Sequence, residues 1–141
     1  MKNYIGTKLI QAEPCPAWKD AGNHKTGDPG YKVVYPDGYA SWSPKDVFED
    51  VYRPTDCLNF GLAIEAAKMG MKIARKGWNG KNQYVELASN ISYINPGKVV
   101  VNPDHEAIGN KALAFCGTSG VQLGWLASQA DMLADDWCIV E

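Results

Sequence analysis

The sequence is poor in the residues that build most metal centres and disulfide frameworks. Its 141 residues include 4 cysteines and 2 histidines. The cysteines are scattered at Cys15, Cys57, Cys116 and Cys138, and no C-x-x-C pair occurs. This spacing gives no support to a zinc site or a thioredoxin-like motif. We therefore expect free thiols in a reducing cytosol, with neither a metal nor a cofactor.

Long apolar runs and an excess of one charge are also missing. The longest uncharged stretch, residues 112–130, contains glycine, glutamine and serine and is too polar to span a membrane. Residues 1–14 lack the apolar core of a signal peptide. The 14 basic and 16 acidic residues give a net charge of −2, which excludes a strongly basic nucleic-acid-binding protein. We expect a soluble protein that binds neither membrane nor DNA or RNA.

Motifs of nucleophilic catalysis are absent as well. His24 and His105 have no Ser, Cys or Asp at a spacing that indicates a nucleophile pair. Neither a G-x-S-x-G motif nor a Walker-type phosphate loop occurs. The adjacent Asp135 and Asp136 cannot face each other as general acid and base, and we interpret them as a solvated turn. The sequence therefore favours a binding protein over an enzyme.

Aromatic residues, by contrast, are abundant. The chain has five tryptophans, seven tyrosines and three phenylalanines. Such a content favours β-structure and planar surfaces that can stack on a ligand. The hydrophobic share of 45% and the charged share of 21% are those of an ordinary globular chain. Its length suits one domain or two small modules.

Turn and cap signals divide the chain near residue 57 into an N-terminal β-rich extension, 1–57, and a second part, 58–141. In the extension we expect strands at residues 4–12, 31–35 and 39–42. Ser43 is expected to cap a helix that begins at Pro44, since serine is a good N-cap and proline suits the first helical position.

The second part carries the clearest helix signals. Asn59 is expected to cap a helix that ends at Gly70, and Ser128 with Asp131 forms a capping box for a short helix. Strands are expected at residues 71–78, 83–88, 98–101, 112–116, 121–125 and 136–140. The whole pattern predicts an α+β fold, a mainly antiparallel β-sheet with short helices packed on one side.

One candidate binding segment is Arg75-Lys-Gly-Trp-Asn-Gly-Lys81. Its Asn79-Gly80 pair predicts a type I′ hairpin turn. Arg75 and Lys81 can neutralise phosphates, Trp78 can stack on a purine, and Asn79 can donate hydrogen bonds. The alternative is a solvated hairpin tip with Trp78 packed on the sheet, and the residue types leave both open.

A second candidate segment runs from Trp125 to Asp131. Trp125 precedes the start of the short helix, and Gln129 and Asp131 can hydrogen-bond ribose hydroxyls. The alternative is structural, with Ser128 and Asp131 capping the helix and Trp125 in the core. Residue chemistry alone therefore predicts a protein that binds a planar, anionic ligand.

Three separated segments also carry a resemblance to a known family. Residues 58–68, 74–81 and 125–137 closely resemble the second Thoeris anti-defence family of bacteriophages, and the resemblance covers residues 58–141. Residues 1–57 look like an N-terminal extension met in other phage proteins, for which the resemblance implies no activity of its own.

The resemblance implies a sponge that binds a cyclic nucleotide without degrading it. Such proteins sequester the glycocyclic ADP-ribose signal of Thoeris defence, and some relatives also hold cyclic dinucleotides of CBASS defence in a second pocket. The family assembles as homo-oligomers, with a tetramer expected and the ligands at subunit interfaces. It acts in the cytoplasm of the infected bacterial host.

These observations lead to one hypothesis and two alternatives. The leading hypothesis is a sequestering protein in which Trp78 or Trp125 stacks on a base. Its expected ligand-binding residues are Arg75, Trp78, Asn79, Lys81, Trp125, Gln129 and Asp131. One alternative is a non-catalytic virion or assembly protein whose aromatic surface is a protein interface. The other is a nucleotide hydrolase that destroys the same signal.

Overall fold

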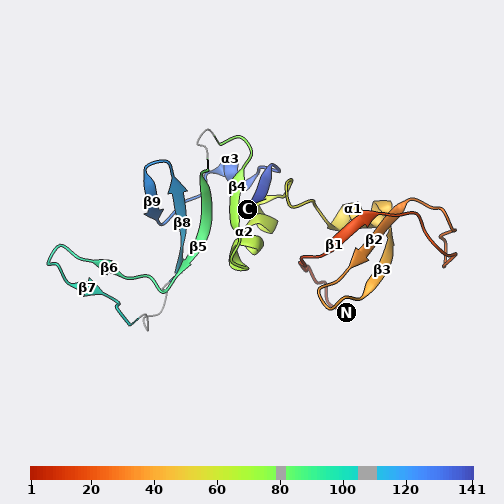
Figure 1. Ribbon diagram of the computed structural model, residues 1–141, viewed down its shortest axis with the longest axis horizontal. Coiled ribbons are helices and arrows are strands. Elements are labelled where there is room, and N and C mark those ends of the chain that lie inside the picture. Colours follow the sequence, from red (N-terminus) through yellow and green to blue (C-terminus); the bar gives the residue numbers. More distant parts are fainter. Residues whose placement is uncertain (79–81, 105–110) are drawn as a thin grey trace. The chain divides into compact units, whose positions relative to one another are not determined.

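The chain forms two compact units, Met1–Arg53 and Pro54–Glu141. A computed structural model describes residues 1–78, 82–104 and 111–141 (Figure 1). We describe each unit by itself. That residues 1–57 serve as an extension to a ligand-binding part, 58–141, stays a prediction.

The N-terminal unit is a three-stranded antiparallel sheet with one helix. Its elements are β1 (Gln11–Pro14), β2 (Gly30–Val34), β3 (Ala40–Pro44) and α1 (Lys45–Val51), with β2 in the centre of the sheet (Figure 1). The rings of Tyr31, Phe48 and Tyr52 stack in series, with centroid separations of 4.1 and 4.9 Å. Aromatic stacking therefore holds α1 against β2.

Two predictions for this unit were wrong in detail. The first strand begins at Gln11 instead of Tyr4, because Gln11 pairs with Val34, the last residue of its only neighbour, β2. Residues before Gln11 therefore have no strand to pair with. Ser43 does not cap α1, because it still belongs to β3 and pairs with Tyr31. Pro44 is the N-cap, and no side chain caps this helix.

The C-terminal unit contains a five-stranded sheet of order β10-β4-β5-β8-β9, with all neighbours antiparallel (Figure 1). The strands are β4 (Lys72–Arg75), β5 (Tyr84–Ser89), β8 (Lys111–Gly117), β9 (Gly120–Leu123) and β10 (Trp137–Val140). This arrangement, with its short helices, confirms the predicted α+β fold. The C-terminal strand lies beside β4, which brings the end of the chain next to a segment more than 60 residues earlier.

Helix α2 (Phe60–Lys68) packs against this sheet and closes the hydrophobic core. The side chain of Asn59 accepts a hydrogen bond from the N–H of Leu62, which confirms the predicted N-cap. Gly70 follows the helix with a φ of +92°, as a left-handed stop requires. Small alanines on the inner face let the helix approach the buried core side chains Leu58, Ile73, Val85 and Trp137.

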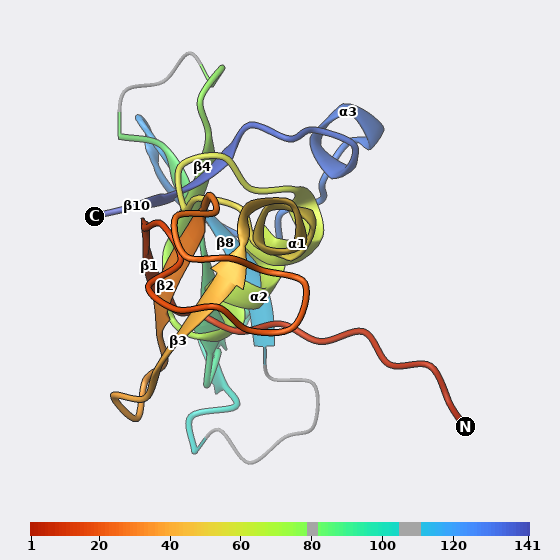
Figure 2. The ribbon, with the colours of Figure 1, turned by 90° about the vertical axis from the view of Figure 1, so that its right-hand side faces the viewer.

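The remaining elements are short. Helix α3 (Gln129–Met132) leads into β10 and the C-terminus (Figure 2). The predicted capping box is confirmed, since Ser128 and Asp131 exchange both hydrogen bonds. Strands β6 (Tyr93–Ile94) and β7 (Val100–Val101) form a separate two-stranded ribbon. Among the described residues, no helix combines the length and apolar character that crossing a bilayer requires.

Candidate functional site

Five aromatic rings meet in the C-terminal unit, and we call them the aromatic cluster: Phe60, Trp78, Phe115, Trp125 and Trp137. They come from α2, β8, β10 and the segments that follow β4 and β9. Trp137 is fully buried, and its ring centroid lies 5.4 Å from those of Phe60 and Trp78 and 6.0 Å from that of Trp125. Such edge-to-face contacts stabilise the cluster beyond the area that it buries.

Trp78 and Trp125 are the two tryptophans of the cluster that remain partly exposed. Their ring centroids are 6.0 Å apart and their planes are inclined by 66°. Trp78 also packs on Phe115, and Trp125 on Phe60. Each ring is thus held by core contacts on one side while part of it faces solvent. That either stacks on a base stays a prediction, and the geometry is compatible with it.

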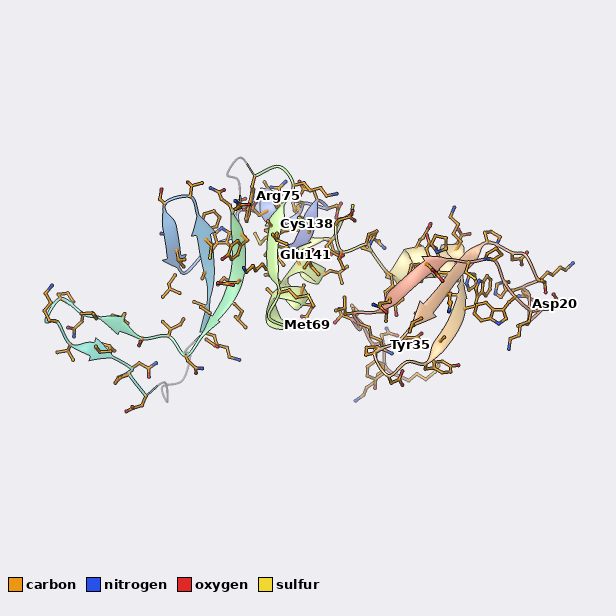
Figure 3. The ribbon with its side chains drawn as sticks, in the orientation of Figure 1. Asp20, Tyr35, Met69, Arg75, Cys138 and Glu141 are labelled. Atoms are coloured by element: carbon orange, nitrogen blue, oxygen red, sulfur yellow. The ribbon has the colours of Figure 1, made fainter. Side chains whose placement is uncertain are left out.

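Beside the cluster, Arg75 forms two ion pairs, and we call Asp131, Arg75 and Asp136 the Asp–Arg–Asp triad. The Arg75 Nε lies 2.9 Å from an Asp136 oxygen, and one terminal nitrogen lies 3.0 Å from Asp131 Oδ1. Figure 3 shows Arg75 on β4, the strand next to β10. The interpretation of Asp136 as part of a solvated turn was therefore wrong.

The triad carries a net charge of −1, from one guanidinium and two carboxylates. The side chains of Arg75, Asp131 and Asp136 are 24%, 16% and 37% exposed, so water screens the pairs only in part. Hydrogen bonding to Asp136, and then to Asp131, raises the pKa of the Arg75 guanidinium. The predicted role of Arg75 in neutralising a phosphate stays untested, and the two carboxylates oppose it.

Asp131 is held by Ser128 and by Arg75. Its carboxylate accepts from the Ser128 N–H at 3.0 Å and from Arg75 at 3.0 Å. Burial by itself would raise the pKa of this carboxyl, but the hydrogen bonds from Ser128 and the Arg75 charge outweigh burial and lower it. Both carboxylate oxygens are engaged within the protein, and the ribose contact predicted for Asp131 stays a prediction.

Of the other predicted site residues, the structure describes only Gln129. Gln129 is the first residue of α3 and is exposed. Asn79 and Lys81, and with them the predicted Asn79-Gly80 turn, lie outside the described residues. Within the part of the chain that the structure describes, no group of three or more His, Cys, Asp or Glu side chains is placed to hold a metal ion.

Sequence reasoning missed four contributors to this region: Phe60, Phe115, Asp136 and Trp137. Trp137 pairs with Arg75 across the β4–β10 ladder, and its centroid lies near those of rings from α2 and from the segment after β4. Contacts between positions so distant in sequence leave no local pattern. The available signal was the high content of aromatic residues, which does not say which of them are in contact.

Comparison with known proteins gives two matches. Residues 58–140 match the profile of the Thoeris anti-defense 2-like domain. The chain is also 36% identical over 89 residues to a protein of Bacillus phage SP01 named Thoeris anti-defense 2. That alignment covers 59% of this chain and 94% of the phage SP01 protein. It thus spans almost the whole relative.

Proposed function

Because the chain belongs to the Thoeris anti-defense 2-like family, we propose that it is a phage anti-defence protein that sequesters a cyclic nucleotide immune signal. The signal proposed is the glycocyclic ADP-ribose made by Thoeris defence, with cyclic dinucleotides of CBASS defence as a second class of ligand. The protein would act in the cytoplasm of the infected bacterium. It would bind the signal without degrading it, so that the host effector is starved of its activator.

The observation that carries this proposal is the pair Trp78 and Trp125, two partly exposed rings held on a packed aromatic cluster. A purine needs a flat apolar face, and stacking on an aromatic side chain contributes about 1–3 kcal/mol per base. Because core contacts already fix both rings, little side-chain entropy is lost when a base stacks on one of them. Tight binding by a small protein requires this kind of preorganisation.

Polar contacts to the ligand are proposed for the segments next to the two rings. Gln129 is exposed four residues after Trp125 and can hydrogen-bond ribose. We assign the phosphates to Lys81 and a further polar contact to Asn79, both outside the described residues. Arg75 and Asp131 form an ion pair with each other, so we assign no ligand contact to them here.

We also propose that the protein assembles with copies of itself, with a tetramer expected. The ribbon of β6 and β7 supports this, because Tyr93, Ile94, Val99 and Val100 are all exposed. A two-stranded ribbon is marginally stable in water by itself, and clustered exposed apolar side chains mark interaction surfaces. A second copy would cover them, and an interface would bury more of a nucleotide than one small sheet can.

Titration calorimetry against a panel of cyclic ADP-ribose isomers and cyclic dinucleotides tests the proposal. A sequestering protein must bind at the low concentrations that activate an effector, so we expect a Kd of roughly 100 nM or below, about −9.5 kcal/mol. If no member of the panel binds more tightly than about 10 μM, the proposal is lost. Heat denaturation of the complex followed by chromatography separates sequestration, which returns intact ligand, from hydrolysis, which returns products.

A further inference from the structure

We propose that Arg75 is a positioning residue: the Asp–Arg–Asp triad fixes Trp78 and Trp125 relative to each other, and the ligand binds to the rings so held. This inference rests on the proposed function and deepens it, because it assigns Arg75 to the architecture of the candidate site instead of to the ligand phosphates.

The first step is the path of the chain from Arg75 to Trp78. Arg75 is the last residue of β4, and its carbonyl accepts a hydrogen bond from the Trp78 N–H at 3.3 Å. The N–H of Lys76 donates to the carbonyl of Asp136 at 3.2 Å. The guanidinium binds the side chain of the same Asp136. Main chain and side chain therefore hold the start of the Trp78 segment to Asp136, the residue that precedes β10.

The second step is the path from Trp125 to Asp131. Ser128 and Asp131 close the capping box three to six residues after Trp125. The other oxygen of that Asp131 carboxylate, which takes no part in the capping box, accepts a hydrogen bond from Arg75. One guanidinium thus joins the segment that carries Trp78 to the segment that carries Trp125. Strands β5 and β8 lie between β4 and β9 in the sheet, so no hydrogen bond of the ladder joins these two segments directly.

The charge of the triad also argues against direct phosphate contact at Arg75. A phosphate that approached Arg75 would meet two carboxylates within 3.0 Å of the guanidinium nitrogens, in a group of net charge −1. Like charges repel, and partial burial strengthens the repulsion. Arg75 suits a fork-shaped contact to carboxylates, which fixes orientation as well as distance. The triad is therefore built for orientation and poorly placed to attract an anion.

Positioning and direct phosphate contact predict opposite effects for Asp136→Asn. If Arg75 positions the rings, losing one carboxylate charge loosens the triad, and the affinity for glycocyclic ADP-ribose falls by roughly 3- to 30-fold. If Arg75 binds phosphate, the same change removes a competing negative charge, and the affinity rises. Arg75→Lys also separates the two, because lysine keeps the charge but loses the fork. The affinity falls if Arg75 positions the rings and changes little if Arg75 binds phosphate.

A second readout needs no ligand. Near-ultraviolet circular dichroism of the free protein reports how the tryptophan rings are oriented, and we expect Asp136→Asn to weaken this signal while the far-ultraviolet signal stays. Asp136→Glu keeps the charge and is expected to restore much of it. Glu65→Gln is the matched control, since it breaks the exposed Glu65–Lys68 pair on α2 and is expected to change neither readout.

The outcomes separate this inference from the proposed function. If the wild-type protein binds no cyclic nucleotide, the proposed function fails, and the circular dichroism arm still decides whether the triad orients the rings. If the wild type binds, and Asp136→Asn binds as tightly or more tightly with an unchanged near-ultraviolet spectrum, the positioning role is overturned. If Asp136→Asn does not fold, Arg75→Lys and Asp136→Glu carry the same comparison.

Discussion

The indole N–H of Trp137 donates a hydrogen bond to the backbone carbonyl of Asp131 at 2.8 Å. Trp137 is 0% exposed, and a buried indole N–H without a partner would cost about 1–3 kcal/mol. The same Asp131 caps α3 through Ser128 and binds Arg75 through its carboxylate. A single residue thus links the buried tryptophan, the short helix and the Asp–Arg–Asp triad.

Acid should destabilise the C-terminal unit through Asp131. Its carboxyl pKa is lowered in the folded protein, against an unfolded value of about 3.9. The stabilisation is therefore complete above about pH 4 and is lost as the pH falls through the lower folded value. Melting temperatures measured between pH 7 and pH 2 should show this decline for the wild type. In Asp131→Asn the decline should be shallower, and equal slopes in the two proteins would contradict the assignment.

Trp78→Ala and Trp125→Ala should each affect both stability and binding. Both rings pack in the aromatic cluster, so each change should lower the free energy of unfolding by about 1–3 kcal/mol, less than the 3–5 kcal/mol of a fully buried aromatic residue. The ring that stacks on the base should in addition lose about 1–3 kcal/mol of binding free energy.

Melting curves and calorimetry on the same two variants identify the stacking ring. Trp137→Ala gives the stability loss for a fully buried ring of the same cluster. It is not a control for binding, because Trp137 contacts both candidate rings. If neither partly exposed ring affects affinity in a variant that remains folded, base stacking at this site is excluded.

Gly30→Ala should destabilise the N-terminal unit. A Cβ at this position would overlap the indole ring of Trp42 and the backbone carbonyl of Ser43 on the neighbouring strand. The backbone oxygen cannot move without breaking the β2–β3 ladder, so we expect a loss of about 1–3 kcal/mol or more. Thermal unfolding measures it. Gly6→Ala is the matched control, because nothing lies within 4 Å of its added Cβ, and an equal effect of the two changes would contradict the packing argument.

Light scattering at micromolar concentration should give a mass of at least two chains. Ile94→Lys places a charge on the exposed apolar surface of the β6–β7 ribbon, and we expect it to lower the assembly mass because a charge is costly to bury in an interface. Val47→Lys on α1 is a control at another exposed apolar position, outside the ribbon, and should leave the mass unchanged. A wild type that is monomeric and still binds tightly would refute binding at a subunit interface.

Local features of the fold could be predicted from the sequence because their causes lie within a few residues. The Asn59 cap, the Gly70 stop and the Ser128–Asp131 capping box each depend on one side chain and the backbone next to it. Predictions were wrong where pairing with another strand sets the bounds of an element. The first strand could not begin at Tyr4 because β2 ends opposite Gln11.

The sequence by itself determined which residue types are available, types that suit a planar anion, and, through the resemblance, it indicated the family. It did not determine which residues meet. Arg75 and Asp136 are separated by 61 positions, and only the antiparallel pairing of β4 with β10 brings them together. That pairing changes Arg75 from a free cation into the centre of an ion-paired group, and it places the Trp137 ring 5.4 and 6.0 Å from the partly exposed rings of Trp78 and Trp125. Charge and ring contacts act over a few ångströms in space, so their effect is decided only when the chain has folded.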